Sequence, residues 1–243
     1  MLCKNPCSLN TGRIVKGQPR KVVGPFSDRV LLIGEAPGRE ESEQLLPFVG
    51  ESGRIIDSKL QEHAIDRGWL DITNAVWCRP PGNRTPTTEE IKYCASSHLD
   101  LLVDFLKPSR IVTFGAVPFS YVSRSKKKIT ANSGTAFQTR YGVPGLAMLH
   151  PAYIIRFSYD KEIMNRWNAD WRVCAHFILN GATVMKPNWH VLRTKADVLA
   201  ALAQPVKNVV FDFETGGLAF DDRIHGIALN FGGNSYYIPF ADP

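Results

Sequence analysis

The sequence contains no apolar run of the roughly 18 residues that a membrane span requires, and no apolar signal segment follows Met1. Low-complexity tracts are also absent. These absences argue against a membrane protein, an exported protein and a fibrous chain. Cysteine is scarce, with five in 243 residues, and an odd number without an export signal argues against a disulfide framework. We therefore expect a globular, cytoplasmic protein with no membrane partner.

What is present is the composition of a folded, basic protein, with 44% hydrophobic residues and a formal net charge of +6. A positive excess favours a polyanionic partner. The side chains that we expect to contact phosphate are Arg84, Arg124, Lys126, Lys127, Lys128 and Arg156. For the basic stretch 124–128, the alternative is a mobile, solvated loop.

One stretch combines a buried strand with a turn that bears a carboxylate. Residues 30–33 are all apolar, as in a central strand of a parallel sheet, and Gly34, Glu35, Pro37 and Gly38 follow directly. Open α/β sheets bind their ligands at the carboxyl ends of their strands. We expect Glu35 to lie at such a site, although an ordinary strand-to-helix turn with an exposed glutamate would have the same pattern.

Three further apolar runs, at 72–77, 110–115 and 146–149, alternate with helical segments. This alternation predicts an α/β fold, a three-layer α/β/α sandwich with a four-stranded parallel sheet. Asn74 lies within the second run, and His150 directly follows the last. Both therefore belong to the edge of the sheet where ligands bind.

The cysteines indicate a metal site. Cys3 and Cys7 form a C-x3-C pair, whereas Cys78 and Cys94 lie far along the chain, at a strand end and in the next helix. Four thiolates suit tetrahedral zinc or an iron–sulfur cluster, and ligand chemistry alone does not choose between them. Cys174 lies in an apolar-striped helix and is expected to be a buried, inert thiol.

Residues 186–188 mark a junction to a second region. The strand after it bears Asp212 and Glu214, whose spacing of two places both carboxylates on one side of a strand, as in sites for divalent metal. Two further strands, at 224–231 and 235–240, are predicted to pair as a hairpin. We expect domains at 1–185 and 186–243.

Taken together, residues 1–185 closely resemble the family-four uracil-DNA glycosylases, the thermophile-type iron–sulfur enzymes. The matching motifs, in the family's order, are Gly34-Glu35-Ala36-Pro37-Gly38, Pro47-Phe48-Val49-Gly50, Asn74, Cys78-Arg79-Pro80-Pro81-Gly82-Asn83-Arg84 and His150-Pro151-Ala152-Tyr153. The resemblance implies a glycosylase-like fold, a 4Fe-4S cluster on Cys3, Cys7, Cys78 and Cys94, and uracil-containing DNA as the partner of a monomeric enzyme.

The resemblance also implies roles at the substrate pocket. Phe48 would stack on uracil, although its place between Pro47 and Gly50 favours a core plug when the sequence is considered alone. Asn74 would recognise the O4 and N3 edge, Glu41 would face C5 and exclude the thymine methyl, and His150 would stabilise charge on the departing base. Backbone amides after Glu35, at Ala36, would support the same edge.

Two departures leave the chemistry open. The residue before Pro37 is Ala36, where the best-known glycosylase class has a water-activating aspartate, so Glu35 or Asn74 would position water instead. The first cysteine pair is C-x3-C rather than the family's usual C-x2-C. Ala36 and the irregular loop from Ser42 to Leu45 also permit a catalytically silent uracil- and DNA-binding module, which is the alternative to an active glycosylase.

Residues 186–243 resemble the start of the 3′–5′ exonuclease domain of family-A DNA polymerases, which has a ribonuclease H-like fold. Asp212 and Glu214 match the first metal-binding motif of that domain, and would bind Mg only if the remaining carboxylates of the site were supplied. The resemblance implies that the chain is the N-terminal part of such a polymerase, the remainder of which would be its partner. A metal-dependent nuclease centred on Asp212 and Glu214 is a third possibility.

Overall fold

A computed structural model of the chain describes residues 3, 7–9, 12–181, 189–203, 209–215, 224–231 and 234–240. The chain divides into two compact units, Met1–Thr183 and Val184–Pro243. No helix in the described parts of the chain is both long and apolar enough to cross a lipid bilayer.

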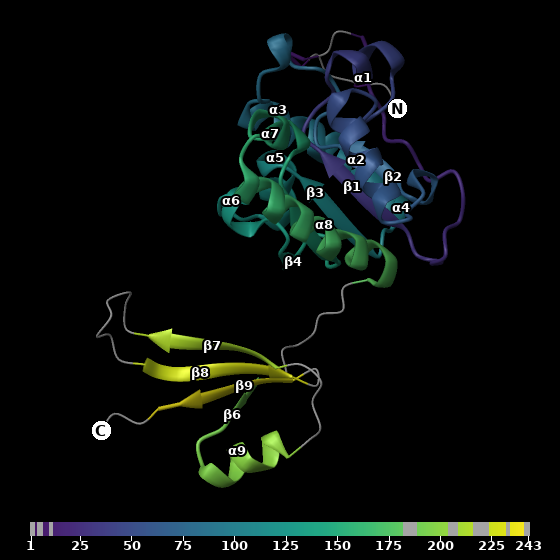
Figure 1. Cartoon of the computed structure of the whole chain (residues 1–243). Coiled ribbons are helices and arrows are strands. Elements are labelled where there is room, and N and C mark those ends of the chain that lie inside the picture. Colours follow the sequence, from purple (N-terminus) through teal and green to yellow (C-terminus); the bar gives the residue numbers. More distant parts are fainter. Residues whose placement is uncertain are drawn as a thin grey trace. The chain divides into compact units, whose positions relative to one another are not determined.

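The first unit is built on a five-stranded sheet in the order β2-β1-β3-β5-β4. Figure 1 shows β2, β1 and β3 of this sheet side by side. Its strands are β1 (Val30–Gly34), β2 (Asp71–Asn74), β3 (Arg110–Phe114), β4 (Ala136–Gln138) and β5 (Pro144–Met148). The four predicted strands are present and pair in parallel, but β4 adds an antiparallel fifth strand beside β5. The prediction of a four-stranded, wholly parallel sheet was therefore wrong. β4 has three residues, two of them exposed, so it lacks the apolar run that marks the others.

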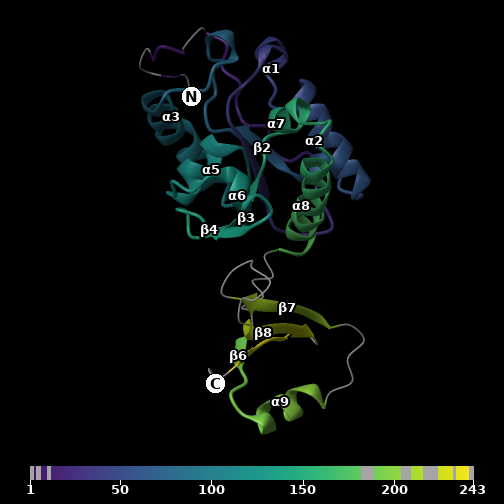
Figure 2. The same ribbon diagram turned by 60° about the vertical axis from the view of Figure 1, so that its left-hand side comes forward.

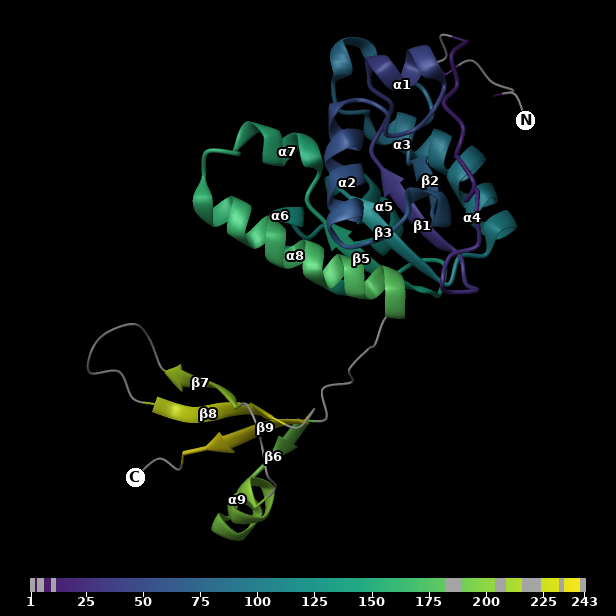
Figure 3. The same cartoon turned by 45° about the vertical axis from the view of Figure 1, so that its right-hand side comes forward.

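Helices cover both faces of this sheet (Figure 2 and Figure 3). One face packs against α2 (Glu51–Glu62), α7 (Pro151–Arg156) and α8 (Lys161–Asn180). The other packs against a π-helical turn (Ala95–Leu99), α4 (Asp100–Leu106) and α5 (Ala116–Ser123). Helix α3 (Thr88–Cys94) packs against the segment that follows β2. Within β1 the side chains alternate between the two cores, because successive residues of a strand point to opposite faces. A short helix α1 (Arg39–Gln44) follows β1, and α6 (Ile129–Asn132) precedes β4.

The parallel register brings the ends of separate strands together. Gly34 of β1 is paired with Asn74 of β2, and Phe114 of β3 is paired with Met148 of β5. Since β1 also pairs with β3 in parallel, the segments that follow β1, β2, β3 and β5 all leave the sheet at one edge.

The second unit contains β6 (Trp189–Val191), α9 (Lys195–Leu202), β7 (Val210–Thr215), β8 (Ile224–Phe231) and β9 (Asn234–Pro239). The predicted hairpin is present as β8 and β9, and the sheet order is β6-β9-β8-β7. Helix α9 packs on this sheet through a small core of buried apolar residues, Leu192, Ala201 and Tyr236. Asp212 and Glu214 lie two apart in β7, opposite Ala228 and Gly226, while their side chains lie outside the described part of the structure.

Candidate active site

A cleft of about 610 Å³ opens at the edge of the first sheet where the parallel strands end. Its lining includes six residues with predicted substrate or catalytic roles: Glu35, Ala36, Glu41, Phe48, Asn74 and His150. These residues thus share one cavity, and its volume is in the range of small-molecule sites. Lining residues to which the sequence had given no role include Arg39, Arg79, Asn83, Thr85 and Tyr153.

Phe48 and Asn74 meet over Gly34 at the floor of the cleft. A Cβ on Gly34 would overlap both the Asn74 amide oxygen and the Phe48 ring, so glycine is required for this close approach. Phe48 is 6% exposed and its ring also contacts Phe114 edge-on, at 6.1 Å between centroids. It is therefore part of the core and part of the cleft. Asn74 is 3% exposed, and its side-chain amide has no hydrogen-bond partner among the described residues, which leaves it available to a ligand.

His150 begins α7 as its N-cap residue, and its Nδ1 accepts a hydrogen bond from the Ala152 backbone N–H at 3.1 Å. Burial, reinforced by the positive charge of Arg156, lowers the pKa of His150 to about 4. The imidazole is therefore neutral at pH 7. Because Nδ1 accepts, the single ring proton is on Nε2, where it can be donated to a ligand.

A buried polar brace holds the chain immediately before His150. The backbone N–H of Leu149 donates to Ser133 Oγ at 3.1 Å, and Ser133 Oγ donates to Asp170 Oδ2 at 2.5 Å. Ser133 is 4% exposed and Asp170, on α8, is 8% exposed. The neighbouring Gly134 has a φ of +76°, and a Cβ there would overlap the Asp170 carboxylate. The brace thus depends on residues from three separate segments.

Glu35 follows β1 directly and is half-buried in the cleft. Burial raises the pKa of its carboxyl group, against the opposing effects of a hydrogen bond with Thr85 and the charge of Arg156. A raised pKa makes the carboxylate a stronger base than an exposed glutamate. Ala36, beside it, has no side-chain group that could act as a base.

Glu41 lies on α1 and is buried, with both carboxylate oxygens bonded to backbone N–H groups. Oε2 accepts from Gly38 at 3.0 Å, and Oε1 accepts from Val49 at 3.0 Å and Gly50 at 2.6 Å. The carboxylate therefore joins the turn after β1 to the loop that carries Phe48.

Comparison with known proteins bears directly on this cleft. Residues 21–172 match the uracil DNA glycosylase superfamily model, which is more than half of the chain. The chain belongs to the uracil-DNA glycosylase superfamily. A type-4 uracil-DNA glycosylase of Thermotoga maritima is 36% identical over 152 residues, covering 62% of this chain and 76% of that protein. A type-4 uracil-DNA glycosylase of Archaeoglobus fulgidus is 30% identical over 163 residues, covering 62% and 77%. The predicted enzyme class, a glycosylase that hydrolyses N-glycosyl bonds, is confirmed at the level of the family.

In this glycosylase-family chain Cys78 and Cys94 belong to one small buried cluster, against which Cys7 packs. Cys3 Sγ lies 3.9 Å from the Tyr93 hydroxyl of α3. Burial raises the pKa of the Cys78 thiol to about 11 and that of Cys94 to about 12, with smaller contributions from the other cysteines of the set. Cys94 Sγ also accepts the Trp77 backbone N–H at 3.2 Å. Within the described residues, no group of three or more metal-binding side chains is arranged to hold an ion. Cys174 is fully buried, as predicted for an inert thiol.

The predicted DNA-binding residues fall into two sets. Arg84 and Arg156 line the cleft, whereas the stretch 124–128 between α5 and α6 contributes nothing to its lining. Arg84 is engaged by Glu90 in a bidentate ion pair, with N···O distances of 2.9 and 2.7 Å. This pairing lowers the pKa of Glu90 to about 2, and Ser8 Oγ donates to the same carboxylate at 2.7 Å. The sequence did not predict that Glu90 would bind both Arg84 and the N-terminal residue Ser8.

Proposed function

We propose that this protein hydrolyses the N-glycosidic bond of uracil flipped out of DNA and leaves an abasic site. The observation that carries this proposal is the convergence of an aromatic ring, a buried amide and a neutral imidazole, Phe48, Asn74 and His150, on one cleft. A base within a stacked duplex cannot present its glycosidic bond to such a cleft, so the target nucleotide has to be extruded first.

The three side chains match the chemistry of uracil. The Phe48 ring would stack on the base, and the Asn74 amide would donate to O4 and accept from N3–H, a pattern that cytosine cannot satisfy. His150 Nε2–H would donate to O2 and stabilise the negative charge that develops there. Because His150 is neutral, this stabilisation comes from a hydrogen bond rather than from an ion pair.

In the proposed step, the bond between C1′ and N1 breaks and its electron pair leaves with uracil. The oxygen of a water molecule bonds to C1′, and Glu35 orients that water and accepts its proton. The raised pKa of Glu35 supports this role, and Ala36 supplies no alternative base. Glu41 remains proposed to exclude the thymine methyl at C5.

We also propose that Cys3, Cys7, Cys78 and Cys94 hold a 4Fe-4S cluster. Four thiolates are the ligand set that such a cluster takes, and Cys7, Cys78 and Cys94 belonging to one small apolar cluster supports this proposal. When bound, the cluster would cross-link these segments and replace the protons that the buried thiols otherwise retain. No chemical step of base removal requires it.

For the second unit we propose an exonuclease-like beginning of a family-A DNA polymerase. Support comes from the antiparallel strands β7, β8 and β9 and from Asp212 and Glu214 in β7. Two carboxylates alone do not complete a two-metal nuclease site, so this chain is expected to release no nucleotides with Mg²⁺. Nucleotide release that is abolished by Asp212→Ala would contradict this expectation.

The deciding experiment is a uracil-release assay on an end-labelled oligonucleotide with one uracil, followed by alkaline cleavage of abasic sites. We expect cleavage at uracil and none at a thymine control. His150→Ala should lower the single-turnover rate far more than it weakens DNA binding. Tight binding of uracil-containing DNA by the wild-type protein without any abasic product would instead select the silent binding module.

A further inference from the structure

Phe48 has an unusual backbone for a residue that forms the floor of a substrate cleft. Its φ is +54°, in the left-handed region that side chains with a Cβ rarely adopt. Such a conformation persists only where the surroundings enforce it. The ring position therefore depends on whatever holds the backbone of the 47–50 loop.

Arg67 holds this loop from one side. Its Nη1 donates to the Phe48 carbonyl oxygen at 3.0 Å and its Nη2 donates to the Pro47 carbonyl oxygen at 2.7 Å. The guanidinium is itself oriented by an ion pair with Asp57, at 2.7 Å from Nη1. Arg67 lies in the short helix Arg67–Trp69 before β2, and it does not line the cleft. The planar fork of an arginine holds five N–H donors in fixed positions, which suits it to bind two successive carbonyls and a carboxylate at once.

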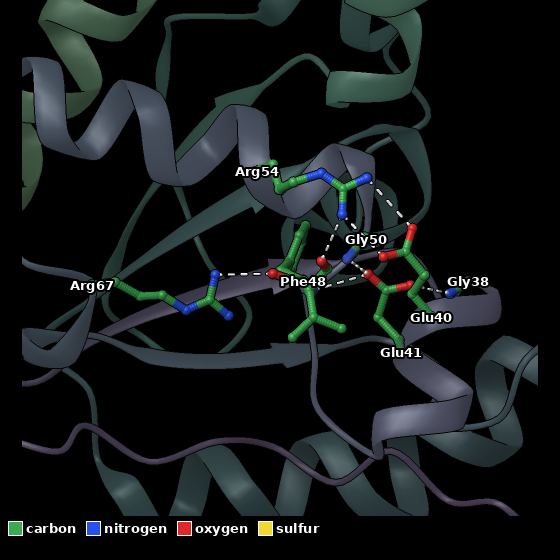
Figure 4. Close-up of polar contacts among 8 residues, drawn as sticks. Gly38, Glu40, Glu41, Phe48, Gly50, Arg54 and Arg67 are labelled. Carbon is green, nitrogen blue, oxygen red and sulfur yellow. Dashed lines mark hydrogen bonds and ion pairs between the residues drawn. The ribbon is translucent and has the colours of Figure 1, made fainter.

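Glu41 holds the same loop from the opposite side, through the amides of Val49 and Gly50 (Figure 4). Helix α2 forms a third wall, because a Cβ on Gly53 would overlap the Phe48 carbonyl. The carbonyls of Pro47 and Phe48 are thus bound by the positive guanidinium of Arg67. The next two backbone amides, of Val49 and Gly50, are bound by the carboxylate of Glu41.

We propose that Arg67 is a positioning residue for the reaction, which fixes the uracil-stacking ring of Phe48 by binding the carbonyls of Pro47 and Phe48 against the anchor at Glu41. Arg67 touches neither substrate nor the reacting atoms. It acts by keeping the loop in a conformation that the chain would otherwise leave. This inference rests on the proposed function, since it takes Phe48 to be the ring under the base.

The first test is uracil release by Arg67→Met, which keeps much of the apolar stem and removes all donors. We expect kcat/KM to fall by about 10- to 100-fold, as for a displacement of a substrate-positioning group by about 1 Å. Arg67→Lys should recover part of the loss, because one ammonium can reach one carbonyl but not both. Asp57→Asn removes the ion pair and keeps both carbonyl contacts, so it should change kcat/KM by less than about 3-fold. Arg172→Met, at an exposed site on α8, is the matched surface control.

A double-mutant cycle with Phe48 tests the route of the effect. Phe48→Leu keeps apolar volume in the core and removes the stacking surface. If Arg67 acts through the ring, Arg67→Met in the Phe48→Leu background should cost less than about 3-fold. Full additivity of the two losses, or an Arg67→Met activity equal to that of Asp57→Asn, would overturn the proposal.

A second readout does not depend on activity. Hydrogen exchange of a peptide spanning residues 46–53 should be faster in Arg67→Met than in the wild type, and unchanged in Asp57→Asn and Arg172→Met. If the wild-type protein releases no uracil, the proposed function fails while this exchange still decides whether Arg67 fixes the loop. Unchanged exchange in Arg67→Met would refute the positioning role, whatever the wild-type activity.

Discussion

The brace behind His150 gives a prediction whose size follows from the contacts. Ser133→Ala removes the oxygen that accepts from Leu149 N–H and donates to Asp170. It leaves a buried amide without an acceptor and a buried carboxylate without its closest donor, since the cation paired with that carboxylate, Arg166, is 4.0 Å away. An unpaired buried group costs about 1–3 kcal/mol, and a hydrogen bond to a charged group is worth about 1.5–3 kcal/mol.

We therefore expect Ser133→Ala to lower the free energy of unfolding by about 3 kcal/mol. For a unit of this size the melting temperature should fall by about 6 to 12 °C. Urea and thermal unfolding measure these changes. Uracil release by the folded variant should also be slower, because the backbone N–H of Leu149 loses its acceptor and His150 is the next residue. Ser158→Ala, at an exposed serine, should stay within about 0.5 kcal/mol of the wild type. An equally small effect for Ser133→Ala would refute the reasoning.

Three further predictions concern pH, an ion pair and a glycine. In a plot of single-turnover rate against pH, the Glu35→Gln variant, which lacks the Glu35 carboxyl group, should show a change near pH 4 from the titration of His150. A change near pH 6.5 would indicate a histidine with its ordinary pKa and would contradict the argument that burial lowers it. Glu90→Gln should lower stability by about 2 kcal/mol at pH 7. That difference in stability should disappear as pH falls from about 4.5 through about 2, because Glu90, whose pKa is lowered in the fold, stabilises it only while its carboxylate is charged. A difference in urea unfolding that does not change with pH would count against the ion pair. Gly53→Ala should destabilise the protein in thermal unfolding although alanine is the better helix former, and a rise in melting temperature would show that the loop carbonyl has room.

The parts of the fold that the sequence predicted are those with a local signal. The four parallel strands are continuous apolar runs, and the rule that ligands bind at strand ends placed Glu35, Asn74 and His150 in one cleft. β4 was missed because a short, exposed edge strand has no such run, and its pairing with β5 is set by tertiary contacts.

The supports of the site could not be predicted in the same way. Arg67 binds backbone carbonyls about 20 residues away, and Ser133 binds an amide and a carboxylate from two other segments. Every residue carries the same backbone carbonyl, and nearly every residue the same N–H, so the sequence does not indicate which of them a distant side chain will bind. A positive φ at Phe48 is also invisible in a residue type that rarely adopts one.

The ion pair between Arg84 and Glu90 bears on how DNA affinity depends on salt. Each phosphate neutralised by a protein cation contributes about 0.9 to the slope of log affinity against log salt on duplex DNA. Glu90 is already paired with Arg84, and transferring the arginine to a phosphate would remove the charged partner of a carboxylate whose side chain is 6% exposed. If the protein binds DNA as proposed, Arg84 should therefore add less to this slope than a cation without a carboxylate partner would.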